Sequence, residues 1–282
     1  MNIIIKNLTE LSALHAAEAL QREVWGIADL EVVHALEMIA VREAGGTVIG
    51  AFAEDLLIGF VYGFLGYEEG VVTIHSHLAA VQKEWRGQQI GFRLKLAQRE
   101  QALSKGITRM TWTFDPLQSL NAHFNFARLG VTASKYRVNF YGAETSILVP
   151  GIGTDRFWAE WHLDSQRVTD RIGSARNISA LTIEAAKALP LVDCVDNGAP
   201  RLNDSWLLRD GVEQPDLLIT IPPDIGAVQR LNPAQAIAWR EITRAAFTKA
   251  FSAGYEAIEF IRYERGGAYL LRPRAQTATK RS

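Results

Sequence analysis

The chain has 282 residues, of which 48% are hydrophobic and 22% charged, and its formal net charge is −1. This composition is typical of a globular protein with a sizeable core, and the balanced charge gives no electrostatic basis for binding nucleic acid or a membrane surface. A single cysteine, Cys194, excludes an intramolecular disulfide and a thiolate metal cluster. No apolar run approaches the ~20 residues that span a bilayer, and the N-terminus lacks signal-peptide features, so we expect a cytoplasmic protein.

Hydrophobic periodicity and turn residues predict a mixed α/β chain. The first part should contain a strand, two helices, three strands, a helix, a strand, a short helix and two strands, at residues 1–7, 9–24, 30–46, 47–53, 56–70, 71–81, 87–105, 107–114, 119–130, 136–142 and 156–163. Further on we expect a strand at 216–222, a helix opened by Asn232-Pro233, and a hairpin that turns at Gly266-Gly267. These elements predict a domain at residues 1–165 and a smaller α+β region at residues 166–282.

A glycine-bearing loop, RGQQIG (residues 86–91), leads from the strand VTIHSHLAAV into the next helix. Gly87 permits an unusual turn, and Gly91 leaves the backbone open to a ligand. The first amides and the dipole of a helix form an anion site suited to a pyrophosphate, to which Arg86, Arg93 and Lys95 can add positive charge. A glycine before a helix is also typical of an ordinary turn.

The loop resembles the acetyl-CoA motif of the GNAT superfamily of N-acetyltransferases, Gln/Arg-x-x-Gly-x-Gly/Ala, with Gln89 in place of the central glycine. Downstream, SLNAHFNFARLG resembles the family pattern Asn-x-x-Ala-x-x-Leu-Tyr-x-x-Leu-Gly. There the family asparagine falls on Ser119, and the tyrosine that protonates the leaving thiolate falls on Phe126. The resemblance covers residues 1–165, with residues 166–282 looking like the C-terminal extension of a bacterial branch. It implies a mixed central sheet, splayed between two neighbouring parallel strands and flanked by helices.

The resemblance also implies how acetyl-CoA, or another acyl-CoA, binds as cosubstrate. The thioester arm pairs with the backbone at the end of the strand before the loop, and the pyrophosphate rests on the loop. The cofactor-binding residues implied in this way are Ala79, Ala80, Val81, Gly87, Gln88, Gln89, Ile90, Gly91, Phe92 and Asn121.

Two histidines, His75 and His77, lie two residues apart on one predicted strand and therefore on one face of it. An amine acceptor must lose a proton, and histidine accepts one near neutral pH. The pattern resembles the His-x-His-x-x-Ala-Val strand of some family members, in which both histidines lie near the acceptor amine. We predict His77, nearer the thioester, as the base, with His75 as the second candidate. The alternatives are structural histidines or metal ligands, but no third ligand is visible and we expect no metal site.

Other polar residues are candidates for the acceptor site. Asp115 ends a strand before a proline, where it can orient a histidine or an ammonium group, or simply form an Asp-Pro turn. Arg240 and Arg244 lie four residues apart on one helix and can clamp a substrate carboxylate, or form a solvated face. Tyr136 or Tyr141 can replace the missing acid, or pack on a strand.

The sequence thus predicts an acyl-CoA-dependent N-acyltransferase, acetyl by default, that acts on a small amine or amino acid by direct attack. One alternative is an N-succinyltransferase acting on amino acids, with the arginine pair holding a second carboxylate. Another is a non-catalytic acyl-CoA-binding regulatory module, which Gln89 and Phe126 favour. We expect no nucleic-acid or membrane partner; the acceptor and the oligomeric state, a homodimer included, stay open.

Overall fold

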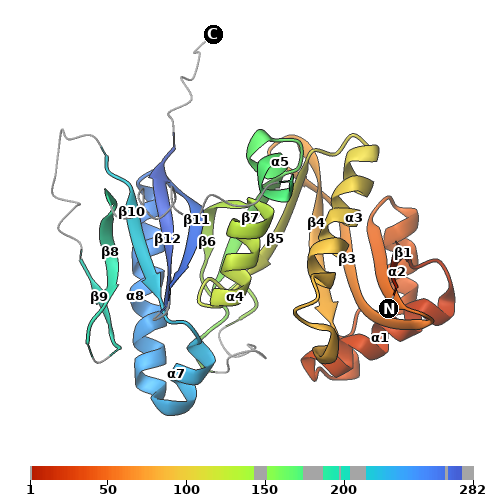
Figure 1. The fold of residues 1–282 in the computed structure, drawn as a ribbon, viewed down its shortest axis with the longest axis horizontal. Helices are drawn as coiled ribbons and strands as arrows, with labels where there is room; N and C mark the ends of the chain where they lie inside the picture. Colours follow the sequence, from red (N-terminus) through yellow and green to blue (C-terminus); the bar gives the residue numbers. More distant parts are fainter. Residues whose placement is uncertain are drawn as a thin grey trace, which may run out of the picture. The chain divides into compact units, whose positions relative to one another are not determined.

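The computed structural model of the chain (Figure 1) describes residues 2–142, 151–173, 187–196, 198–203, 214–263 and 266–274. The chain forms two compact units, one made of Met1–Trp112 with Glu160–Gln166 and the other of Thr113–Ala159 with Arg167–Ser282. Both units combine helices and strands, which confirms the predicted α/β class. The boundary between the units runs through two strands, so the predicted domain boundary between residues 165 and 166 stays a prediction.

The sheet of the first unit has the order β1-β2-β3-β4-β5. Its strands are β1 (Ile3–Asn7), β2 (Thr47–Ala53), β3 (Leu56–Glu68), β4 (Val71–Val81) and β5 (Arg109–Phe114), the last of which continues into the second unit. Neighbours from β1 to β4 pair antiparallel, and β4 pairs parallel with β5. Every residue of β2 is buried, as expected for a strand covered on both faces.

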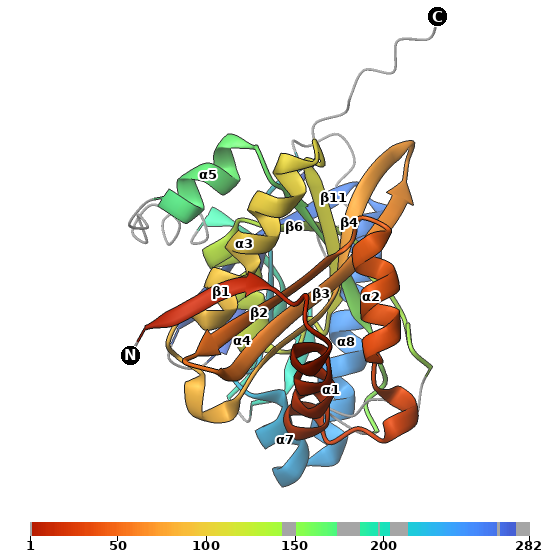
Figure 2. The same cartoon turned by 90° about the vertical axis from the view of Figure 1, so that its right-hand side faces the viewer.

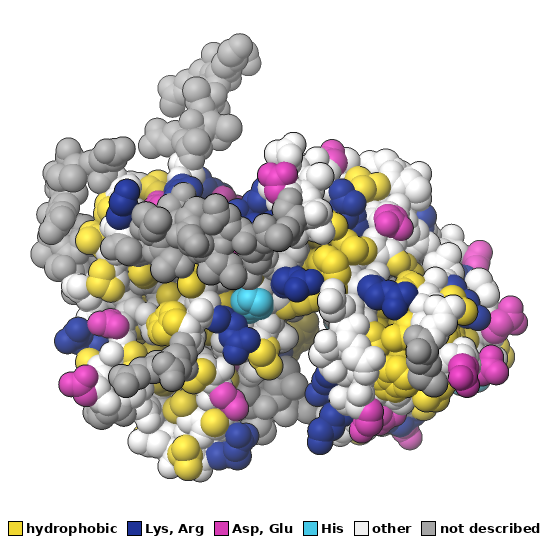
Figure 3. All heavy atoms as spheres, viewed as in Figure 1, with side chains coloured by type: hydrophobic (Ala, Val, Ile, Leu, Met, Phe, Trp, Pro, Cys, Tyr) yellow, Lys and Arg dark blue, Asp and Glu magenta, His cyan; other side chains and the backbone are white. Residues whose placement is uncertain are grey.

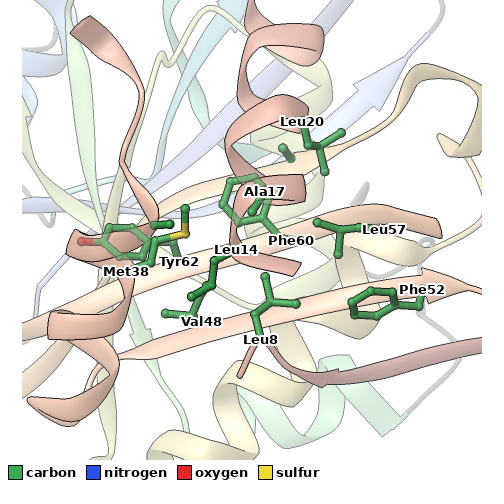
Figure 4. Close-up of a cluster of buried hydrophobic side chains, with 12 residues drawn as sticks. Leu8, Leu14, Ala17, Leu20, Met38, Val48, Phe52, Leu57, Phe60 and Tyr62 are labelled. Carbon is green, nitrogen blue, oxygen red and sulfur yellow. The ribbon is translucent and has the colours of Figure 1, made fainter. Parts of the chain in front are cut away.

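Helices cover the two faces of this sheet (Figure 2). They are α1 (Leu11–Trp25) and α2 (Ala35–Glu43) on one face, and α3 (Ile90–Ser104) on the other, with a short 3-10 turn at Asp29–Glu31 and another at Lys83–Trp85. The α1/α2 face is held by a buried cluster that includes Leu14, Met38, Phe60 and Tyr62 (Figure 4). Burial of each such side chain stabilises the fold by about 1.5–3 kcal/mol relative to its exposure.

Strand β4 carries one more residue than its partner β3 at a single point. The consecutive β3 residues Tyr62 and Gly63 pair with Leu78 and Ser76, so His77 has no β3 partner of its own. One extra residue in one strand of an antiparallel pair is a β-bulge, and it breaks the alternation of side chains between the two faces. The bulge therefore falls on the residue predicted as the catalytic base.

The sheet of the second unit has the order β7-β6-β11-β12-β10-β8-β9. The strands are β6 (Thr132–Arg137), β7 (Arg156–His162), β8 (Leu189–Cys194), β9 (Pro200–Leu202), β10 (Leu217–Ile221), β11 (Tyr255–Tyr263) and β12 (Gly266–Pro273). The helices are α4 (Ser119–Ala122), continued by a π-helical segment (His123–Leu129), α5 (Gln166–Gly173), α7 (Ile225–Leu231) and α8 (Pro233–Ser252).

The helix predicted from Asn232-Pro233 is confirmed, and the side chain of Asn232 caps it by accepting a hydrogen bond from the Gln235 amide. The predicted turn at Gly266-Gly267 is wrong, because both glycines already pair with β11. A Cβ on Gly267 would collide with the ring of Phe260, so close packing rather than a turn accounts for this glycine.

The strand predicted at residues 136–142 is also misplaced. Strand β6 lies at Thr132–Arg137, and the chain turns afterwards, where Asn139 adopts a left-handed φ of 46°. Asparagine is one of the few residues that take this conformation readily, so it ends the strand.

Lysine and arginine side chains are interspersed with aspartate and glutamate on the face shown in Figure 3, in keeping with the balanced charge. Among the described residues, no helix has the length and apolar run needed to cross a bilayer. Within the same residues, no three His, Cys, Asp or Glu side chains gather as metal ligands would.

Candidate functional site

The loop before α3 has left-handed backbone at two positions. Gly87 has a φ of 82° and Gln89, the residue that precedes the helix, a φ of 61°. A residue with a Cβ pays about 1–2 kcal/mol for this conformation. The loop therefore keeps the backbone conformation of a glycine, although Gln89 stands where the motif has its central glycine. Helix α3 still begins at this turn, where its first amides have no partner within the helix.

Three basic residues at the loop, Arg86, Arg93 and Lys95, are engaged with the chain itself. The guanidinium of Arg93 donates to the Ile3 carbonyl at 2.6 Å, and Arg86 Nε donates to the Val81 carbonyl at 3.2 Å. Lys95 is only 4% exposed, so the expectation that it adds charge at the loop is wrong. The backbone and the helix dipole are thus the main features of the loop that favour an anion.

The predicted thioester segment lies where β4 leaves β5. Among the described residues, the β4–β5 ladder consists of the pairs Ile74–Met110 and His75–Thr111. Residues 79–81 pair with β3, on the other side of β4. In an antiparallel strand alternate amides and carbonyls point away from the paired neighbour, so this stretch of β4 offers backbone groups to an extended ligand.

The two histidines form an aromatic cluster with β3 on the α1/α2 face of the sheet. The ring centroids of His75 and His77 are 6.3 Å apart, and Phe64 lies 5.3 Å from the first and 5.7 Å from the second. Tyr62 lies 6.3 Å from His77 in an edge-to-face arrangement. His75 and His77 share this face by the ordinary alternation of a strand, and the bulge brings the next residue, Leu78, to the same face.

The two imidazoles differ in their surroundings. His75 is buried, and its Nδ1 lies 3.0 Å from the Thr111 hydroxyl; burial, His77 and Lys95 lower its pKa to about 4, against a smaller opposing effect of Glu68. His77 is exposed, and desolvation lowers its pKa against a smaller opposing effect of the Glu37 carboxylate. A base works best with a pKa near the working pH, so His77 is the better suited of the two.

A polar network occupies the opposite, α3-covered face of β4. Lys95 donates to the Ser76 hydroxyl at 2.7 Å, and its ammonium lies 3.9 Å from the centre of the Trp112 ring. Ser76 in turn donates to Gln98 at 2.8 Å, and Gln98 donates to Thr47 at 2.7 Å. Burial lowers the pKa of Lys95 to about 7.

We expect Lys95 to make the stability of the protein depend on pH. Its pKa is lower in the folded state than in the unfolded chain, so the unfolded state binds more protons between about pH 7 and pH 10.5 and folding becomes more favourable as pH rises through that range. The free energy of unfolding should rise by on the order of 2 kcal/mol between about pH 7 and pH 9. Urea unfolding across this range should show the rise in the wild type and in Lys105→Met but not in Lys95→Met; a rise of equal size in all three would contradict the assignment.

Asp115 is buried within the second unit and paired with Arg240. Its carboxylate accepts two hydrogen bonds from the guanidinium, at 2.9 and 2.8 Å, and a third from the Leu117 amide at 2.9 Å. The third bond is that of the Asp-Pro turn given as the alternative from sequence. Arg240 is 2% exposed and also donates to the Ile152 carbonyl at 3.0 Å, so it is part of the core of this unit.

Arg244 is paired in the same way. Its guanidinium bonds both oxygens of Asp155, at 2.7 and 3.0 Å, and Asp155 also accepts a hydrogen bond from the Tyr136 hydroxyl at 2.7 Å. Burial and the nearby carboxylate keep the pKa of Tyr136 well above its ordinary value. Each guanidinium of the predicted clamp thus holds a carboxylate of the chain itself, and Tyr136 is poorly suited to give up a proton.

The predicted residues of α4 divide into an exposed and a buried group. Asn121 is exposed on α4, whereas Phe126 is fully buried, with its ring centre 5.4 Å from that of Tyr269. The Ser119 hydroxyl is buried and has no hydrogen-bond partner among the described residues. Phe126 is thus a core residue of the second unit.

Sequence reasoning missed two residues beside the histidines, Glu37 and Tyr62. The Tyr62 hydroxyl donates to a Glu37 carboxylate oxygen at 3.0 Å. They come from α2 and β3, 25 residues apart, and no local spacing links them. Only the predicted order of helices and strands, with the histidine strand beside β3, hinted that α2 covers this face.

Comparison with known proteins finds a family model that matches part of the chain. Residues 11–131 match the model of the acetyltransferase (GNAT) family. Similar solved structures include the PaiA N-acetyltransferase of Thermoplasma acidophilum in complex with coenzyme A, at 20% identity and a TM-score of 0.40 over 57% of this chain and 99% of that one. Another is an acetyltransferase of the GNAT family from Streptococcus pneumoniae, at 14% identity and a TM-score of 0.45 over 56% of this chain and 98% of that one.

A comparison with curated protein sequences gives no significant match. The family match includes β4, the loop and α3, which carried the resemblance in the sequence. Part of the chain, residues 11–131, is thus similar to the GNAT family of acetyltransferases.

Proposed function

We propose that the chain transfers the acetyl group of acetyl-CoA to a small amine by direct attack, with His77 as the base. The observation that carries the proposal is the position of His77, which has no β3 partner and lies in an aromatic cluster beside the stretch where β4 and β5 no longer pair. An imidazole held there is next to the backbone on which the thioester arm is expected to lie.

The reaction we propose balances without a further reactant. The neutral amine nitrogen attacks the thioester carbon, a backbone amide near Ala79 stabilises the oxyanion, and collapse of the intermediate forms the C–N bond and breaks the C–S bond. The proton lost by the amine goes to His77. The electron pair of the broken bond leaves on the CoA sulfur as a thiolate. The thiolate takes a proton from water, and His77 returns to solvent the proton that it took from the amine.

The cofactor contacts follow the sequence predictions. We propose that residues 79–81 pair with the arm, that the loop from Gly87 to Phe92 holds the pyrophosphate, and that Asn121 is a further contact. The left-handed backbone of Gln89 supports this assignment, because the residue adopts the conformation that a glycine would give the loop.

Acetyl is favoured over succinyl as the acyl group. A succinyl donor brings a second carboxylate, and the predicted receptor for it, the arginine pair, is engaged by Asp115 and Asp155. Binding of the succinyl carboxylate by Arg240 or Arg244 would require one of these ion pairs to open.

The test is thiol release from acetyl-CoA by the purified protein with a panel of primary amines and amino acids, with the product identified by mass. Release that depends on an amine supports the proposal. Binding of CoA without release for any acceptor would instead support the non-catalytic module, and faster release from succinyl-CoA would revive the succinyltransferase.

A further inference from the structure

A carboxylate stands beside the aromatic cluster of the candidate base. Glu37 lies in the first turn of α2 and is exposed, with one oxygen bonded to the Tyr62 hydroxyl at 3.0 Å. Its other carboxylate oxygen has no hydrogen-bond partner among the residues that the structure describes. Tyr62 is 1% exposed, and burial together with Glu37 raises its pKa above the ordinary value, so it remains a donor that fixes the carboxylate.

The negative charge of Glu37 acts on His77: it raises the pKa of the imidazole and so partly offsets the lowering by desolvation. The rings of Tyr62 and Phe64 lie on either side, 6.3 and 5.7 Å from the imidazole. The described groups at His77 are therefore a carboxylate, two aromatic rings and the neutral imidazole of His75. Lys95, the cation that influences His75, bonds Ser76 on the opposite face of the sheet.

We infer that Glu37 determines acceptor specificity: it holds the ammonium group of an amine that carries an aromatic or apolar substituent and no carboxylate. The inference rests on the proposed function and narrows its acceptor. An ammonium group gains from a carboxylate and from aromatic faces. An α-amino acid would also bring its own carboxylate, which the Glu37 carboxylate repels.

A purely structural role for Glu37 makes different predictions. An acidic residue in the first turn of a helix interacts favourably with the helix dipole, which accounts for a glutamate there but not for its contact with the cluster. If the dipole were its whole role, Glu37→Gln would change stability slightly and leave acceptor recognition unaltered.

The experiment compares 2-phenylethylamine with phenylalanine, which differ only by a carboxylate, in thiol release from acetyl-CoA. The wild type should have a kcat/KM at least about tenfold higher for the amine. Glu37→Gln should raise the KM for the amine about 10- to 100-fold, the range expected for one charge-assisted hydrogen bond, and reduce the preference over phenylalanine. The matched control, Glu43→Gln, alters a glutamate of the same helix that pairs only with Arg42 in the described structure and should leave both unchanged.

The pH profile of kcat/KM is a second measurement, and a purely structural role of Glu37 would leave it unchanged. Glu37 stabilises protonated His77, so Glu37→Gln should shift the acidic limb of kcat/KM to lower pH, with His75 and Tyr62, the other titratable groups at His77, unaltered. Tyr62→Phe, which frees the carboxylate but keeps the ring, should raise the KM less than Glu37→Gln does.

The outcomes separate this inference from the proposed function. Thiol release with equal kcat/KM for the two acceptors, or Glu37→Gln with unchanged KM and pH profile, would overturn the acceptor assignment alone. Absence of thiol release with every acceptor would overturn the proposed function, and this inference with it. Thermal unfolding of each variant checks that it is folded.

Discussion

Replacing His77 with alanine should lower kcat by about 10²–10⁴ while leaving the affinity for CoA nearly unchanged. The imidazole is the proposed acceptor of the proton that the amine loses, so without it that proton must go to water. The bulged position has no β3 partner to lose, and the substitution should leave the ladder of β4 intact. Steady-state thiol release and calorimetric titration with CoA measure the two quantities.

Two further variants sharpen this result. His15→Ala removes a surface histidine of α1 that bonds Glu18 at 3.1 Å, and it should leave kcat unchanged. His75→Ala should cost less than His77→Ala, because the low pKa of His75 makes it a weak base and its Nδ1 is engaged with Thr111. If His77→Ala retains the wild-type kcat, His77 is not the base.

Breaking the buried pair of Asp115 and Arg240 should destabilise the protein by about 3–5 kcal/mol. Asp115→Asn keeps an oxygen that can accept from the Leu117 amide but removes the charge, so it leaves the Arg240 guanidinium, 2% exposed, without its counterion. Arg240→Met should do the same to Asp115. The double variant should recover part of the loss, because neither buried charge remains.

Urea unfolding of the two single variants and the double variant measures this coupling. The control is Asp216→Asn, which breaks the more exposed bidentate pair with Arg272 and should cost only about 0.2–1 kcal/mol. Losses below about 1 kcal/mol in both single variants would show that the buried pair contributes little to stability. The same variants bear on specificity, because a succinyl-CoA activity appearing in Asp115→Asn would mean that the freed arginine can hold a carboxylate.

The predictable part of the structure was the part that depends on short-range patterns. The apolar strands, the helix with Asn232 and Pro233 at its start, and the two histidines on one face all follow from periodicity and capping. The family motif located the loop even though Gln89 departs from it.

The rest depends on contacts between residues far apart in the chain. The spacing of Arg240 and Arg244 shows that they share a helix face, but their carboxylate partners lie 125 and 89 residues away. Gly267 resembles a turn residue, yet it is required where the backbone passes over Phe260. The bulge could not be predicted from the sequence either, because no residue type in β4 marks the position at which the strand gains a residue.

The bulge has a consequence for how this domain can vary. With His77 removed, the pairs on either side of it, Gly63–Ser76 and Tyr62–Leu78, would run on as an uninterrupted ladder, and every other β4 side chain would keep its face. The pairing of β4 with β3 therefore does not depend on His77. Chemistry at this position can therefore be gained, exchanged or lost in descendants of the chain without redesign of the scaffold that carries it.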